Sequence, residues 1–151
     1  MLDILHFIHI TAAAIFVGSV IFFDWVLGAA LGRQSVDERK NLILAVRPFS
    51  GPVLIWSLTV TLTAGIGRLW VSGAVTEWGD LWQGYGLRAV AAFIIVVASE
   101  GLAAPIRKRL RAAIDQGDTE NFRRYLTRQR ALNSVVLIVV LLLMASMRMG
   151  W

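Results

Sequence analysis

Four long apolar stretches, separated by segments in which the charged residues gather, dominate this sequence of 151 residues. A helix that crosses a bilayer needs about 20 mostly apolar residues, and the stretches at about residues 4–31, 52–71, 87–106 and 131–147 meet that requirement. None of them alternates polar and apolar residues as the strands of a membrane β-barrel do. The sequence therefore predicts an all-α integral membrane protein, with residues 1–151 forming a single membrane domain, a four-transmembrane-helix bundle.

Composition excludes the other broad classes of protein. Charged residues make up 17% and hydrophobic residues 57% of the chain, whereas soluble domains carry about 25% charged residues. The apolar content argues against disorder, and the absence of cysteine argues against a disulfide scaffold. The first stretch is too long for a signal-peptide core and has no basic start or small-residue cleavage site, so we expect it to be retained.

The basic residues indicate an orientation. Of the 15 Lys and Arg residues, 12 lie in the connections before the second and fourth stretches, and only Arg68, Arg88 and Arg148 lie at the opposite helix ends. Because cytoplasmic loops collect Lys and Arg, both connections are expected in the cytoplasm and both termini on the extracytoplasmic side.

The basic cytoplasmic connection, residues 107–130, contains its own turn. Gln116-Gly117-Asp118 separates two segments that we expect to be helical extensions, with Thr119 capping the second and Asp118 and Glu120 near its positive end. The basic residues are expected to meet water and the anionic lipid of the bilayer. Nucleic acid is not expected as a partner, because no aromatic residues alternate with the basic ones as a stacking platform.

Two histidines near the N-terminus are the first candidates for a site, since ionisable groups inside spanning segments are costly. His6 and His9 lie three residues apart, which places both imidazoles on one helix face with Cβ atoms about 5–6 Å apart. Histidine is the commonest metal ligand, and its neutral form suits an apolar setting. The alternative is that both histidines only form hydrogen bonds with water or a neighbouring helix.

The end of the fourth helix is methionine-rich. Four antiparallel crossings bring Met144, Met147 and Met149 to the level of His6 and His9, and the first two methionines share a helix face. Thioether and imidazole ligands together suit a copper ion, or a haem iron with one His and one Met ligand. The absence of thiolates and the few carboxylates disfavour zinc and magnesium. The alternative is that these methionines only fill space in the packing.

Haem b is the alternative cofactor. Both histidines lie on the first helix, so haem would need His with Met, a five-coordinate iron or a partner subunit. Arg68, Arg88 and Arg148 could then neutralise the haem propionates, or they could extend to lipid phosphates instead.

Two acids lie within the apolar stretches. Asp24 follows the middle of the first stretch and Glu100 lies in the inner half of the third, so the two are expected at similar depth. They could form an intramembrane proton or cation relay. The alternative is pairing with an arginine such as Arg47 or Arg107.

The remaining features have structural interpretations. Trp78, Trp82 and Tyr85 in the outer loop are expected to anchor it among lipid headgroups, the alternative being a lid over a ligand. Gly65 and Gly67 on the second helix permit a close approach of another helix.

The opening segment LHFIHITAAAIFVGSVIFF, with Leu5, His6, Ala12–Ala14 and Gly18, resembles the start of the copper-resistance protein D (CopD) family and its small four-helix relatives. RPFSGPVLIWSLTVTLTAGIGRLW is similar to that group's second helix, and AAPIRKRLRAAIDQGD to its third helix and basic stretch. This resemblance implies copper handling, by binding or passage, at the periplasmic side of a bacterial inner membrane.

A related group, the HemJ-type protoporphyrinogen oxidases, has a matching histidine at His6, but this chain has FFDWVLGAALGRQ where that group has a Leu-Pro-Arg-rich stretch. That resemblance implies the alternative function, a b-type haem redox protein linked to quinone or porphyrin. A non-catalytic subunit of a larger membrane complex is a third possibility for the function. The partners considered are a larger membrane complex of this kind or further copies of the chain in a homo-oligomer. No nucleophilic triad, glycine-rich phosphate loop or paired-carboxylate site indicates another enzyme class.

Overall fold

The structure is a computed structural model that describes the backbone of residues 1–148 and the side chains of residues 1–147. These residues form helices and no strand, as the sequence predicts, and four of the helical segments are long and apolar enough to cross a membrane. The elements are α1 (Leu2–Ile21), the π-helical turn η1 (Phe22–Leu27), α2 (Gly28–Leu31), α3 (Val36–Val71), the 3-10 helix η2 (Trp78–Trp82), α4 (Gly84–Asp115) and α5 (Thr119–Arg148).

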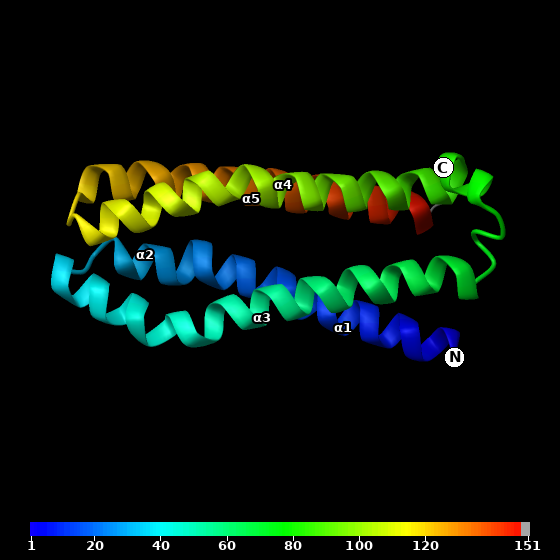
Figure 1. The fold of residues 1–151 in the computed structure, drawn as a ribbon, viewed down its shortest axis with the longest axis horizontal. Coiled ribbons are helices and arrows are strands. Elements are labelled where there is room, and N and C mark those ends of the chain that lie inside the picture. The colour runs from blue at the N-terminus through cyan, green and yellow to red at the C-terminus, as the bar shows by residue number, and fades with distance from the viewer. Residues whose placement is uncertain (149–151) are drawn as a thin grey trace.

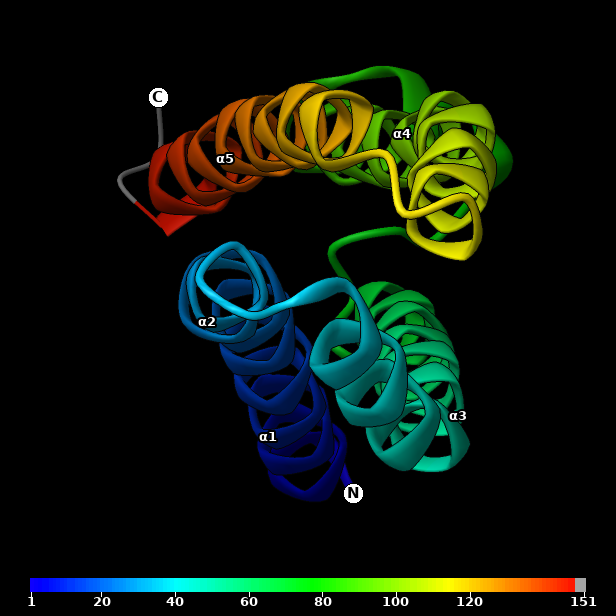
Figure 2. The same cartoon turned by 90° about the vertical axis from the view of Figure 1, so that its left-hand side faces the viewer.

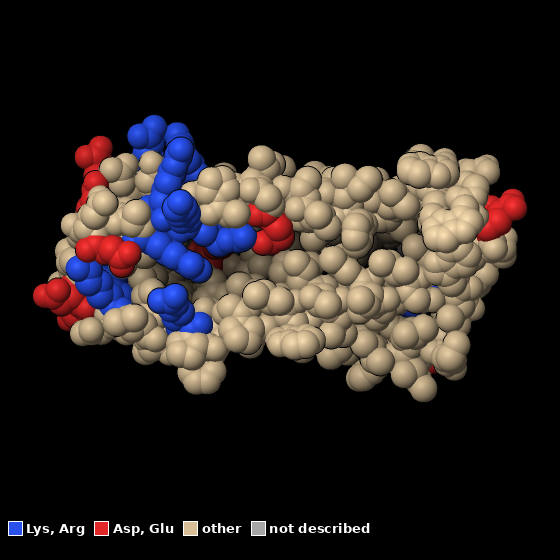
Figure 3. Space-filling model, viewed as in Figure 1, with Lys and Arg blue, Asp and Glu red and all other residues tan. Residues whose placement is uncertain are grey.

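The helices form two hairpins that lie in two layers (Figures 1 and 2). The rod formed by α1, η1 and α2 packs along α3, and α4 packs along α5. We call the end with the turns at 32–35 and 116–118 the basic end, because Lys and Arg gather there in Figure 3. The opposite end, with the N-terminus, residues 72–83 and the end of α5, is called the terminal end.

The helices are longer than the apolar stretches. Residues 36–51, expected to belong to a connection, form the beginning of α3, while α4 continues to Asp115 and α5 already begins at Thr119. Ser35 begins α3 with a capping box, in which its hydroxyl accepts from the Glu38 N–H and Glu38 Oε2 accepts from the Ser35 N–H at 3.0 Å. Apolar composition marks the part of a helix that suits lipid, and caps such as this one decide where the helix begins.

The expected turn at residues 116–118 is confirmed, but its cap is a different residue. Asp118 Oδ1 accepts the Asn121 N–H at 2.9 Å, and the Asn121 Nδ2 donates to Asp118 Oδ2 at 2.7 Å. Thr119, expected to be the cap, is instead the first residue of α5. Asp118 can therefore satisfy a free N–H group of the first turn, which is the function of an N-cap. Gly117 supplies the positive φ of 70° at this turn.

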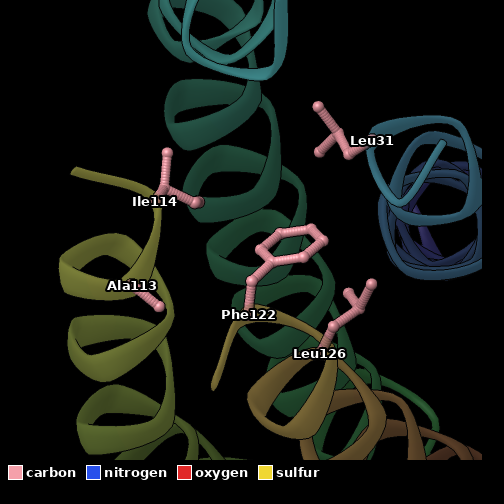
Figure 4. Packing of buried hydrophobic residues seen from close by; sticks show 5 residues of the cluster. All are labelled: Leu31, Ala113, Ile114, Phe122 and Leu126. Carbon is pink, nitrogen blue, oxygen red and sulfur yellow. The ribbon is translucent and has the colours of Figure 1, made fainter. Parts of the chain in front are cut away.

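The apolar core lies at the basic end and joins the two hairpins. It consists of Leu31, Ala113, Ile114, Phe122 and Leu126 (Figure 4). Phe122 is 1% exposed, and the Arg39 guanidinium carbon lies 4.3 Å from the centre of its ring. Arg39 Nε also donates to the Leu31 carbonyl oxygen at 3.1 Å. One arginine on α3 thus contacts both α2 and α5.

We expect Phe122→Ala to destabilise the protein by about 3–5 kcal/mol, because it leaves a cavity in this core and removes the ring beneath Arg39. The free energy of unfolding in detergent measures the effect. Phe49→Ala is the matched control, since Phe49 on α3 is 70% exposed. Equal losses for the two variants would contradict the position of the core.

Candidate functional site

His9 is held between α1 and α3. Its Nδ1 lies 2.8 Å from the carbonyl oxygen of Thr61, and because a carbonyl can only accept, Nδ1 carries the hydrogen in this bond. The same bond therefore leaves the lone pair on Nε2. A metal-ligating histidine almost always has its other ring nitrogen bound to a carbonyl or carboxylate in this way.

A glycine opposite His9 makes this approach possible. A Cβ atom at Gly65 would lie 3.0 Å from His9 Cε1 and 3.2 Å from Nδ1, and one at Gly67 would lie 3.6 Å from Leu5 Cδ1. The close approach expected for these two glycines is therefore confirmed, with α1 as the neighbouring helix. Thr61 and Gly65 are one turn apart on α3, so a single face of α3 receives the imidazole ring.

The other groups on these helices differ in exposure. His6, one turn before His9, is exposed. Arg68 lies three residues after Gly65, on the same side of α3, and is half-buried. Its buried Nε has no hydrogen-bond partner in the part of the chain that the structure describes. One side of α3 thus carries both the contact with the His9 imidazole and a guanidinium whose buried Nε has no partner among the described residues.

The methionines lie at the same end but in the other layer. Met144 and Met147 belong to α5, which packs against α4, whereas α1 diverges from α5 toward the terminal end (Figure 2). The expected common level is thus present, but the structure does not bring the methionines against the histidines. Within residues 1–148 there is also no group of three or more His, Asp or Glu side chains that could hold a metal ion. Met149 lies outside the described residues.

The arginines expected near a cofactor have different surroundings. Arg88 at the start of α4 donates from Nη1 to the Ser146 carbonyl oxygen at 2.8 Å. This contact places a cation at the C-terminal end of α5, where the helix dipole favours positive charge. Arg88 therefore has a structural role in joining α4 to α5. The side chain of Arg148 lies outside the described part of the chain.

Asp24 and Glu100 have separate partners. Arg107 Nη2 donates to Glu100 Oε2 at 2.7 Å, which is the arginine pairing considered as the alternative for this acid. Asp24 instead accepts from Asn133 Nδ2 at 2.6 Å, and no hydrogen bond joins the two acids in the described chain. The sequence did not indicate Asn133, because only the packing of α5 against η1 brings it to Asp24.

The tryptophan loop is exposed at the terminal end. Trp78 and Trp82 are 75% and 69% exposed, and Trp78 meets Trp70 edge to face with ring centres 5.4 Å apart. The buried Val75 and the Asp80 carboxylate hold the loop together. Asp80 Oδ2 accepts from the Thr76 and Glu77 N–H groups and from the Thr76 hydroxyl. Such exposed rings suit the headgroup anchoring that the sequence predicts.

The basic end carries an open hollow along α4. One helix face lines it, with the three basic residues Arg107, Lys108 and Arg111, the small residues Ala104 and Ala112, and Asp115. It begins where the apolar stretch of α4 ends, so in a bilayer its cations would meet lipid headgroups.

Comparisons with known proteins identify no relative: no protein-family model, no curated protein and no solved structure matches this chain. The candidate site is therefore argued only from the residues of this chain.

We expect Gly65→Ala to displace the His9 ring, because the new methyl group would lie 3.0 Å from Cε1. The displacement should weaken the bond to Thr61 and lower the melting temperature, and the His9 ring resonances in NMR spectra report it directly. Gly51→Ala is the control on the same helix, since a Cβ there meets no atom within 4 Å. Unchanged His9 resonances in Gly65→Ala would contradict the packing described.

We also expect the tryptophan loop to keep its structure in mild acid. Hydrogen bonds from the Thr76 N–H, the Glu77 N–H and the Thr76 hydroxyl lower the pKa of Asp80 below its ordinary value of 3.8. A lowered pKa means that the stabilisation is present above the ordinary value and is lost as pH falls through the lower one. Tryptophan fluorescence between pH 7 and pH 2, compared with Asp80→Asn, measures this. A loop transition above pH 3.8 that Asp80→Asn abolishes would refute it.

Proposed function

We propose that this chain is a small protein of a bacterial inner membrane that binds a metal centre near its terminal end and handles copper, by binding or passage. The observation that carries the proposal is the His9–Thr61 hydrogen bond. It fixes the ring and leaves Nε2 free to bind a metal. His6, one turn away, offers a second imidazole nitrogen.

Copper is proposed because of the ligand types at this end. Imidazole suits copper, and the soft thioether of methionine suits Cu(I), while the chain has no cysteine. Met144 and Met147 are the proposed soft partners. They reach the histidines only if α1 and α5 approach one another or if a second copy of the chain supplies them. A homo-oligomer is therefore part of this proposal.

The charge distribution supports the proposed orientation. Lys and Arg gather at the basic end (Figure 3), and the cytoplasmic side of a membrane protein collects these residues. The basic end is then cytoplasmic, and the proposed metal centre and both termini are extracytoplasmic. The bilayer is the surrounding partner, with anionic lipid at the basic end.

Haem b is the second candidate, and Arg68 favours it. Its buried Nε lacks a partner in the described chain, while the guanidinium shares an interface with His9. Arginine binds carboxylates through charge-assisted hydrogen bonds, so Arg68 suits a haem propionate beside a His9-ligated iron. The protein would then be a redox protein linked to quinone or porphyrin.

We expect the His6→Ala, His9→Ala double variant to lose all copper that the detergent-purified protein carries, because it removes both imidazoles. Elemental analysis measures copper per protein. Gln83→Ala, in the loop at the same end, is the control and should keep the wild-type content. Copper binding that survives the double variant would overturn the proposed ligands.

An absorption spectrum of the same sample separates the candidates. A Soret band with sharp α and β bands after reduction supports haem, and a colourless copper-containing protein excludes it. A protein that carries neither group and loses stability when separated from its complex would instead be a non-catalytic subunit.

A further inference from the structure

Far from the proposed metal centre, buried and half-buried polar side chains gather where the two hairpins meet. Gln129, Arg130 and Asn133 lie within little more than one turn of α5, and η1 packs against this part of the helix. Gln129 is 5% exposed. Arg130 Nε donates to the backbone carbonyl oxygen of Asp24, and Asn133 Nδ2 donates to its carboxylate. This group of polar residues thus lies where the basic connection of residues 107–130 meets the apolar stretch of α5.

Asp24 lies in the only π-helical turn of the described chain, Phe22–Leu27, and is 8% exposed. A π-turn interrupts the regular helical hydrogen bonds and is frequent at functional sites. Here the Asp24 carbonyl oxygen accepts from Arg130, a side chain of the other hairpin. Gly28, one turn later, leaves room for that side chain, since a Cβ there would lie 3.0 Å from Arg130 Nη2.

The polar groups of this interface are incompletely satisfied. Arg130 Nη2 and Gln129 Oε1 are buried, and neither has a hydrogen-bond partner among the residues described. Nearer the basic end, Arg39 is 2% exposed and its Nη1 also lacks a partner. Buried polar atoms in proteins are normally paired, and ordered water is the usual partner where protein groups are absent.

These unpaired atoms lie along one stretch of α5, from Phe122 to Asn133. Arg39 packs on Phe122 at the basic end, and from Phe122 to Asn133 α5 rises about 16 Å at 1.5 Å per residue. Gln129 and Arg130 lie between these two positions. The unpaired atoms therefore lie between the basic end and the level of Asp24, and Leu126 of the apolar core lies among them.

We propose that ordered water fills this interface and connects Asp24 to the basic end, so that Asp24 is an intramembrane site for the uptake of a proton. The Asp24 carboxylate gains one proton from the water and becomes a carboxylic acid, and the water regains a proton from the solvent. The charged groups that act on Asp24 are Arg130 on α5 and Arg107 on α4. Neither takes part in the transfer, because arginine stays protonated.

Glu100 provides the matched comparison. It is the other acid of the spanning segments, but its side chain is 42% exposed and is paired with Arg107. Glu100 therefore already has a cation bound to its carboxylate, whereas the Asp24 carboxylate accepts from the uncharged Asn133 amide. The proposal therefore assigns proton uptake to Asp24 alone.

Dicyclohexylcarbodiimide tests the assignment, because this apolar reagent modifies protonated carboxyl groups in apolar surroundings. The full-length protein in lipid vesicles is treated over a series of pH values, and the modified peptides are quantified by mass spectrometry. We expect modification of Asp24 that rises at least several-fold as pH falls, is lost in Asp24→Asn and persists in Glu100→Gln. Modification at Glu100 instead of Asp24, or none at either acid, would overturn the proposal.

A second experiment tests the proposed water path. It does not use Asp24→Asn and therefore remains informative if that variant fails to fold. Hydroxyl-radical footprinting oxidises side chains beside bound water inside a membrane protein. We expect oxidation of Leu126, whose Cδ1 lies beside Gly28, and a several-fold decrease of it in Gln129→Leu. Gln116→Leu, in the exposed turn, is the control and should leave it unchanged. Protection of Leu126 in the wild-type protein would show a dry interface and refute the path.

Discussion

The need to pair every backbone N–H and C=O group within the chain is the constraint from which the rest of this structure follows. In a bilayer no water replaces a lost hydrogen bond, so a spanning segment has to be helical. Even Pro48 and Pro52 lie inside α3, and Pro105 lies inside α4. The irregular turn η1 is therefore informative, because its Asp24 carbonyl oxygen accepts a hydrogen bond from Arg130 of the other hairpin.

The same environment decides what holds the helices together. Lipid is as apolar as leucine, so helices associate through close packing of small residues and through polar contacts. Gly65 against His9 joins α1 to α3, and Asn133 with Asp24 joins the two hairpins. Among residues 1–147, a core of the kind found in soluble proteins forms only at the basic end, around Phe122. The contacts that hold this fold together are thus also those that place its candidate functional groups.

Much of this arrangement could be predicted from the sequence, and the remainder depends on packing. Apolar length gives the four spanning segments, and Gln116–Asp118 gives the turn between α4 and α5. The topology also predicts that His9 and Met144 lie at the same end of the bundle, because antiparallel crossings fix how far along the helix axis each residue lies. Their separation into different layers depends on side-chain packing, as does the meeting of Asp24 with Asn133. No local pattern in the sequence encodes either of these.

The basic residues of this chain fall into two groups, one exposed at the basic end and one packed between the helices. As a group they indicate the cytoplasmic end, and exposed residues such as Arg123 and Arg124 suit that role. Arg39 is buried, however, and Arg130 binds Asp24 within the hairpin interface. A guanidinium has five donor hydrogens, while the carbonyl groups of a helix are already engaged in its own hydrogen bonds. Arg39 and Arg130 therefore each retain a buried nitrogen that has no partner among the described residues, and buried polar groups of this kind are normally paired with water or a ligand.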